Sequence, residues 1–139
     1  MQTAADAESP IVISANIATP SFIKIFVGDL DVATSFYETA FGFVYADRFA
    51  TAHYDEIVLT PTGGAGLRIV LCRWKDGQEL QFGNACGPIG LSVKNVSAAH
   101  DHAVSRGAVS MLSTVTYKAM RFAIVSDPDG HMLELIGEN

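Results

Sequence analysis

Short runs of alternating hydrophobic and polar residues recur along most of this chain, and such alternation predicts half-buried β-strands. Two longer runs instead repeat hydrophobic residues at the helical period. The first predicts a helix over residues 31–43, with Val32, Phe36 and Ala40 on one face, and the second a helix over residues 94–108. The predicted strands lie at residues 22–27, 43–50, 54–61, 66–74, 88–93, 109–117, 119–126 and 131–137.

Turn and capping residues indicate where these elements end. The acidic segment GDLD (28–31) can cap the start of the first helix, and Gly42 is a signal for its end. Asn95 or Ser97 lies near the start of the second helix. DPDG (127–130) fits a type I turn before the last strand, because proline stands at its second position and glycine at its fourth.

The order of one strand, one helix and three strands occurs twice. Aligning residue 22 with residue 88 gives a repeat spacing of 66 residues. A chain of 139 residues is long enough for one domain with a substantial core. We therefore predict a single α+β domain at residues 21–139, with module one at about 21–75 and module two at about 86–139.

Four predicted strands, at residues 22–27, 66–74, 88–93 and 131–137, each have two different faces. One face is uniformly aliphatic, as expected beneath a helix. The opposite face, called the mixed face from here on, combines aromatic, small and charged residues: Phe22, Lys24, Phe26, Arg68, Val70, Cys72, Pro88, Gly90, Ser92, Met132, Glu134 and Ile136. This face is too apolar to lie open to water and too polar to be packed core, so we interpret it as a cavity wall.

Composition and charge narrow the classes of partner. The formal net charge is −6 without a lysine or arginine cluster, which argues against nucleic acid and weakly favours a cationic ligand. No run approaches the ~18 consecutive apolar residues of a membrane span. Residues 1–20 are interpreted as an N-terminal extension without a secretory signal, in which residues 11–17 could add an edge strand. Cys72 and Cys86 share no redox or zinc spacing, so we expect a cytoplasmic protein with reduced cysteines.

The segments VGDLDVATSFYETAFGF (27–43) and DPDGHMLELIG (127–137), together with the doubled element order, resemble the vicinal oxygen chelate superfamily. That group includes glyoxalase I, extradiol dioxygenases, fosfomycin resistance enzymes and bleomycin-binding resistance proteins. The resemblance covers about residues 21–139. It implies two βαβββ modules that form a curved, cleft-enclosing mixed sheet, the glyoxalase/bleomycin resistance fold. It also implies that two chains pair as a homodimer.

The resemblance further implies where a metal ion would bind, because the family draws its ligands from four matching strand positions. Here these positions hold Phe22, Val70, Pro88 and Glu134, and only Glu134 has a side chain that can ligate a metal. One carboxylate holds a divalent ion poorly.

The sequence does not place other potential metal ligands together where they could replace the missing ones. His53 and Glu56 are three residues apart on a predicted strand, so they face opposite sides. His100 and His102 are separated by about 200° around a helix and are interpreted as solvated. Cys72 is interpreted as a small buried hydrophobic residue. We therefore predict no metal site and no cofactor.

Glu134 is the one charged residue of residues 132–136, and an isolated buried carboxylate finds a partner or becomes protonated. Lys24 and Arg68 belong to the mixed face and are candidates for an ion pair with it. Alternatively, Glu134 anchors a ligand or acts as a general base, which makes it the candidate catalytic residue. The sequence leaves the structural and the functional role open.

The mixed face is predicted to bind a small amphipathic or aromatic molecule, because ligand sites are mostly apolar with few polar groups. The candidate ligand-binding residues are Phe22, Lys24, Phe26, Arg68, Val70, Pro88, Ser92, Met132 and Ile136, and the resemblance adds Phe122 and Ile124. Tyr54, Trp74 and Tyr117 are considered for its rim. We favour a metal-free binding protein that is similar to the bleomycin-binding branch. The alternative is a metal-dependent lyase, isomerase or dioxygenase.

Overall fold

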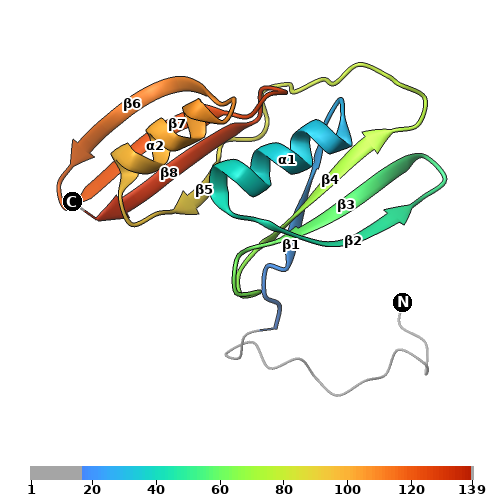
Figure 1. Ribbon diagram of the computed structural model, residues 1–139, viewed down its shortest axis with the longest axis horizontal. Helices are drawn as coiled ribbons and strands as arrows, with labels where there is room; N and C mark the ends of the chain where they lie inside the picture. The colour runs from blue at the N-terminus through green and yellow to red at the C-terminus, as the bar shows by residue number, and fades with distance from the viewer. Residues whose placement is uncertain (1–16, 139) are drawn as a thin grey trace, which may run out of the picture.

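The computed structural model describes residues 17–138, which form two βαβββ modules (Figure 1). Module one contains β1 (Phe22–Phe26), α1 (Leu30–Phe41), β2 (Val44–Ala50), β3 (Tyr54–Thr60) and β4 (Arg68–Trp74). Module two contains β5 (Ile89–Ser92), α2 (Val96–Ser105), β6 (Val109–Tyr117), β7 (Met120–Ser126) and β8 (Met132–Glu138). The predicted α+β class and element order are confirmed. The edge strand considered at residues 11–17 lies, except for its last residue, outside the described residues.

The eight described strands form two separate four-stranded mixed sheets. The strand order is β1-β4-β3-β2 in module one and β5-β8-β7-β6 in module two. The first strand of each module runs parallel to the last, whereas the other strands pair antiparallel. Within residues 17–138 no strand pairing joins the two sheets. The cleft-enclosing sheet that the resemblance implies is therefore not closed within one chain.

Both helices begin with the predicted capping residues. Asp29 Oδ1 accepts a hydrogen bond from the Val32 amide at 2.9 Å, and Asn95 Oδ1 accepts one from the Ala98 amide at 3.0 Å. These bonds satisfy amides that have no partner inside the helix. Helix α1 ends at Gly42, whose φ of 76° is a left-handed conformation that glycine adopts without steric cost.

The buried face of α1 differs from the predicted one. Val32 is 54% exposed, although Phe36 and Ala40 are buried as expected. The remaining buried residues of the helix are Leu30, Ala33 and Tyr37. Each step of four residues turns a helix about 40° past a full circle. Val32 therefore lies about 80° away from Ala40 and reaches solvent.

The helices cover the aliphatic faces of the two sheets. In Figure 1, α1 and α2 lie side by side, each in front of the sheet of its own module. Beneath them, one continuous core combines buried residues of both modules, among them Ile25, Val27, Phe36, Ile69, Leu71, Ala103, Val125 and Leu133. The aliphatic faces read from the strand periodicity are thus the core faces, and the core packs the two modules together.

The DPDG turn also links the modules through hydrogen bonds. Asp127 is buried, and its Oδ1 accepts hydrogen bonds of 3.0, 2.9 and 2.8 Å from the amides of residues 129–131. Its Oδ2 accepts from the Tyr37 hydroxyl at 2.7 Å and from Nδ1 of His131 at 2.9 Å. Because Tyr37 belongs to α1, a turn of module two is tied to the helix of module one.

Gly137 in β8 is required by a close approach of the chain. A Cβ atom there would lie 2.6 Å from the Val93 carbonyl oxygen. We expect Gly137→Ala to lower the free energy of unfolding by about 1–3 kcal/mol, because the backbone must shift to relieve the overlap. Gly90→Ala in the paired strand β5 is the matched control, since its Cβ would meet nothing within 4 Å. Equal effects of the two variants in urea denaturation would contradict this account.

Candidate functional site

The mixed face of module one contains an acid that the sequence did not connect to it. Directly opposed residues of paired strands share a face. Glu56 in β3 lies opposite Cys72 in β4, and Phe49 in β2 lies opposite Glu56. Because Cys72 belongs to the mixed face, Glu56 and Phe49 belong to it as well. The strand period had only shown that Glu56 and His53 face opposite sides.

Lys24, Tyr54 and Glu56 form a hydrogen-bonded cluster on this face. Lys24 Nζ lies 3.0 Å from Glu56 Oε2 and donates a hydrogen bond to the Tyr54 hydroxyl at 3.1 Å. The Glu56 side chain is 13% exposed, so its charge is largely removed from water. The hydrogen bond with Tyr54, followed by that with Glu56, raises the pKa of Lys24 above its usual range. Lys24 therefore carries a positive charge at neutral pH.

Cys72 lies against this cluster and is buried. Its Sγ is 3.7 Å from Glu56 Oε2. Burial, followed by the negative charge of Glu56, raises the pKa of Cys72 to about 12. Because the thiolate is the reactive form of cysteine, this thiol is not a nucleophile at neutral pH. The interpretation of Cys72 as a small buried residue is confirmed.

Three aromatic rings pack together beside the cluster. Phe26 stacks on Trp74, with ring centroids 4.1 Å apart and planes at 12°. Tyr54 meets Phe26 and Trp74 edge-on, at centroid distances of 5.4 and 5.7 Å. Phe22, at the start of β1, is 49% exposed and offers an open ring face. Module one therefore presents an aromatic surface around one lysine.

The ion pair suggested for Glu134 is not formed. Lys24 is paired with Glu56, and Arg68 donates to the Ser21 hydroxyl at 2.9 Å. The prediction was wrong because β1 and β4 belong to the sheet of module one, whereas Glu134 lies in the sheet of module two. No hydrogen bond or ion pair joins the Glu134 side chain to any residue between 17 and 138.

Glu134 lies within an apolar stretch of module two. It is half-buried and is flanked by Gly90 in β5 and Ile124 in β7. Phe122, Ile124, Met132 and Ile136 are likewise half-buried on this side of the sheet. Pro88 and Ser92, beside β5 and at its end, are exposed. Val70, in contrast, is buried in the other sheet, where it lies beside Lys24. The predicted ligand-binding residues are therefore divided between two sheets.

The residues at the four positions where the resemblance implies a metal ion do not fit such an ion. Phe22, Val70 and Pro88 offer no donor atom, so Glu134 would be the sole ligand of the four positions. A second group of potential metal ligands consists of Asp127, Asp129 and His131, whose ligand atoms lie close enough together to bind one ion. Both oxygens of Asp127 and Nδ1 of His131 are already engaged in the hydrogen bonds of the DPDG turn. We therefore assign no chemistry to a metal at either place.

The two histidines of α2 differ from the sequence-based interpretation. His100 is buried, and its ring nitrogens lie 2.9 Å from Asp101 Oδ1 and 2.7 Å from Ser110 Oγ. The interpretation of His100 as solvated was wrong, because β6 packs against this side of α2. His102 is exposed as expected, and its Nε2 donates to the Thr39 carbonyl of α1 at 2.7 Å.

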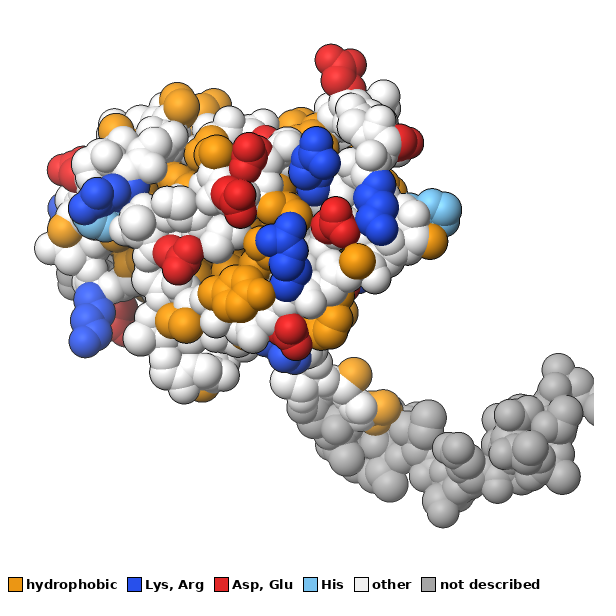
Figure 2. All heavy atoms as spheres, turned by 45° about the vertical axis from the view of Figure 1, so that its right-hand side comes forward, with side chains coloured by type: hydrophobic (Ala, Val, Ile, Leu, Met, Phe, Trp, Pro, Cys, Tyr) orange, Lys and Arg blue, Asp and Glu red, His pale blue; other side chains and the backbone are white. Residues whose placement is uncertain are grey.

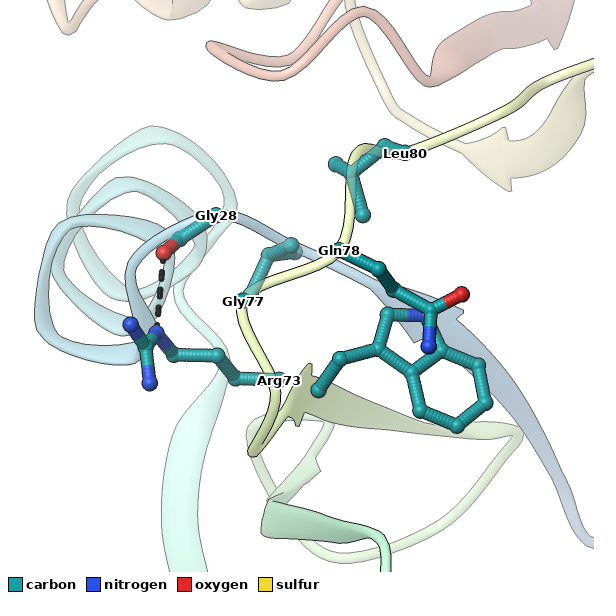
Figure 3. Close-up of a pocket in the computed structure, with 7 residues that line it drawn as sticks. Gly28, Arg73, Gly77, Gln78 and Leu80 are labelled. Atoms are coloured by element: carbon teal, nitrogen blue, oxygen red, sulfur yellow. Dashed lines mark hydrogen bonds between the residues drawn. The ribbon is translucent and has the colours of Figure 1, made fainter.

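Two hollows of the described surface lie apart from the Lys24 cluster. Figure 3 shows the smaller one, of about 90 Å³, where Arg73 Nε donates to the Gly28 carbonyl at 3.1 Å beside Trp74 and Leu80. It is too small for an organic ligand, whose sites usually measure about 300–1,000 Å³. A wider groove of about 530 Å³ runs over α1 on the helix side and includes Val32.

The surface shows no large patch of one charge on the side drawn in Figure 2. Acidic and basic side chains are interspersed there with hydrophobic ones. Among the described residues, no helix is long and apolar enough to span a membrane.

Solved structures similar to this chain share its fold. Glyoxalase I from Zea mays is 22% identical with a TM-score of 0.73, and the match covers 83% of this chain but 43% of that enzyme. A glyoxylase/bleomycin resistance protein/dioxygenase domain from Frankia sp. EAN1pec is 21% identical with a TM-score of 0.73, over 89% and 100% of the two chains. TnmS3, an antibiotic binding protein from Streptomyces sp. CB03234, is 22% identical with a TM-score of 0.71, over 90% and 99%.

The match thus spans less than half the length of the maize enzyme. No curated protein matched it. The family model of the Glyoxalase/Bleomycin resistance protein/Dioxygenase superfamily matches residues 19–135, which include module one and module two as far as β8. The two βαβββ modules and the matched segment agree with the resemblance seen in the sequence, and the chain belongs to this superfamily.

Proposed function

We propose that this protein binds a small amphipathic or aromatic molecule on its mixed faces and does so without a metal ion. The supporting observation is the composition of these faces, where partly exposed apolar side chains lie among a smaller number of polar groups. Phe22 of module one and Met120 of module two are both partly exposed large apolar side chains on these sheets. Apolar surface of this kind commonly marks a binding site. The antibiotic-binding name of TnmS3 favours the same class of function.

The proposal includes a second copy of the chain. Within the described residues, β1 and β5 each pair with only one neighbouring strand, so each leaves one edge open. Open edges and exposed apolar rings are the features that association covers. In such a homodimer the mixed face of one chain would be closed by its partner. We also place the protein in the cytoplasm, on the support of two free cysteines.

Glu134 has the role of a polar anchor in this proposal. Its carboxylate is half-buried among apolar residues and has no partner within the described part of its own chain. A ligand hydroxyl or ammonium group that donates a hydrogen bond to it would satisfy this charge. Since hydrogen bonds to charged groups contribute about 1.5–3 kcal/mol, such an anchor is expected to raise affinity at least about tenfold.

The function is tested by a thermal-shift screen of aromatic amines, phenols and neutral aromatic compounds. A compound at a hundredfold excess over its Kd stabilises the folded protein by about 2.7 kcal/mol. For aromatic amines we expect Glu134→Gln to weaken binding about tenfold. Glu138→Gln, an exposed carboxylate of the same strand, is expected to leave it unchanged.

Other outcomes would change the proposal. Stoichiometric zinc, nickel, manganese or iron in elemental analysis of the purified protein would overturn the metal-free part. Turnover of a bound compound that Glu134→Gln abolishes while binding persists would assign Glu134 as a general base instead of an anchor. A monomer in analytical ultracentrifugation, with or without a bound compound, would overturn the shared cleft.

A further inference from the structure

The Lys24–Tyr54 pair on module one has unused hydrogen-bond donors. An ammonium group has three N–H bonds, and Lys24 uses one toward Glu56 and one toward the Tyr54 hydroxyl. The Tyr54 hydroxyl accepts from Lys24, so its own proton remains free to donate. Neither the third N–H of Lys24 nor this hydroxyl proton has an acceptor in residues 17–138. Two donors therefore lie 3.1 Å apart on a partly open surface.

The pair is held in place by its surroundings. Glu56 fixes the ammonium at 3.0 Å from a carboxylate that is itself largely buried against Cys72. The ring of Tyr54 is held edge-on by Phe26 and Trp74. Donors that are already oriented lose little conformational entropy on binding. Their preorganised position favours an acceptor oxygen that reaches both groups.

The negative net charge of the chain would suggest that it repels a negative ligand. The charges close to the Lys24–Tyr54 pair do not have this effect. Lys24 and Arg68 are the cations of this mixed face, and Glu56 and Asp47 are its acids. Since Asp47 lies opposite Val58 on an outer strand, the acid nearest to the donors is Glu56, whose charge is matched by Lys24. Charges beyond a Debye length of about 8 Å are largely screened, so local donors decide which ligand is preferred.

Open aromatic rings flank the donors. Lys24 Nζ lies 5.9 Å from the ring centroid of Phe22 and 5.2 Å from that of Tyr54. Phe49, opposite Glu56, is also half exposed. A planar ring stacked on Phe22 would bring a substituent of that ring to the donor pair.

We propose that the ligand of this site is a planar aromatic acid, whose carboxylate or phenolate oxygen accepts hydrogen bonds from Lys24 Nζ and the Tyr54 hydroxyl. This inference rests on the proposed function and adds the chemical class of the ligand. The acidic group of the ligand would bind to module one, whereas Glu134 of module two would bind a hydrogen-bond donor of a ligand.

Three probes of the same shape test it: 2-naphthoate, neutral 2-acetylnaphthalene and the cation 2-naphthylmethylammonium. We expect isothermal titration calorimetry of the full chain to show that 2-naphthoate binds at least about tenfold more tightly than the neutral probe. Lys24→Met is expected to remove this preference while the neutral probe still binds. Tyr54→Phe is expected to remove part of it, because one of the two donors is lost.

Two further variants separate recognition from folding. Lys24→Met leaves Glu56 without its cation, so the double variant Lys24→Met, Glu56→Gln provides the same test without an unpaired charge. Lys75→Met is the control, since Lys75 pairs weakly with Asp55 at 3.9 Å and lies outside the cluster.

The possible outcomes distinguish the inferred class of ligand from the proposed binding function. Equal affinities of the anionic and neutral probes, or a preference that persists in both Lys24 variants, would overturn the inference and leave the binding function standing. Stronger binding of the cationic probe would likewise overturn it and would favour Glu134 as the main anchor. If none of the three probes bound at millimolar concentration, the inference and the aromatic-binding function would both be rejected.

Discussion

Replacing Asp127 with alanine is expected to lower the free energy of unfolding by about 3–5 kcal/mol, the range observed when one partner of a buried charged pair is removed. Asp127 is 1% exposed and accepts hydrogen bonds from Tyr37, from His131 and from the amides of residues 129–131. The alanine variant leaves these donors buried without an acceptor. Urea denaturation of the variant and the parent chain measures the difference.

Two variants with smaller expected effects show which hydrogen bonds account for the loss of stability in Asp127→Ala. Tyr37→Phe removes only the hydroxyl that links α1 to the turn, and we expect it to cost about 1–1.5 kcal/mol. Asp129→Asn keeps an oxygen that can accept from the Gly28 amide, and we expect a change within about 0.5 kcal/mol. If Asp127→Ala cost no more than Tyr37→Phe, the hydrogen bonds within the turn would add nothing to the bond with Tyr37. If Tyr37→Phe cost nothing, the turn would not be the link between modules that its contacts indicate.

The lowered pKa of Asp127 predicts how the free energy of unfolding depends on pH. Burial by itself raises the pKa of Asp127, but hydrogen bonds from His131 and Tyr37, and the charge of His131, outweigh it and hold the pKa below its usual value. Between the folded and the unfolded pKa, the unfolded chain binds more protons, so stability falls as the pH drops below about 4. Above the unfolded pKa this contribution is fully present. In Asp127→Asn, the loss of stability between about pH 5 and pH 3 should be smaller than in the parent chain.

Phe36→Ala is expected to destabilise the protein by about 3–5 kcal/mol, the cost of removing a buried aromatic side chain and leaving a cavity. Phe36 is 3% exposed and packs edge-on against Tyr37 and Phe41, at centroid distances of 5.1 and 5.8 Å. These rings lie where α1 meets the core that both modules share. The surrounding rings can fill such a cavity only in part.

Val32→Ala on the same helix is the control for this prediction. Val32 also belongs to the apolar series that the sequence places on one face, but its side chain is largely exposed. We expect a change within about 0.5 kcal/mol. Thermal and urea denaturation of both variants distinguish the two positions, and similar losses would show that the buried stripe of α1 is not centred on Phe36.

Local patterns were sufficient for most of the architecture. Period-two alternation identified the strands, and Asp29, Gly42 and Asn95 marked the ends of the helices, because capping depends on neighbouring residues only. Alternation also separated the aliphatic face from the mixed face, since successive strand residues point to opposite sides. The family resemblance followed from the doubled element order and from two motifs, which the structure places in α1 with its flanking residues and in the turn that leads into β8.

These local patterns could not show which side chains of different strands and helices contact one another. The sequence suggested Glu134 as the acid for Lys24, whereas the register of β3 against β4 brings Glu56 to it. His100 was interpreted as solvated, because nothing in the helix itself shows that β6 covers it. Such pairings join residues distant in sequence, and their geometry depends on register and packing.

The sequence by itself determined which residues form strands and helices, which face of four of the strands enters the core, and which family the chain resembles. These properties follow from interactions over a few neighbouring residues. Only the tertiary structure decided that the two sheets remain separate within one chain, that Asp127 joins the modules, and that Lys24 meets Glu56 and Tyr54. The physical reason is that side chains from different strands meet only after register and packing have been set by the whole core.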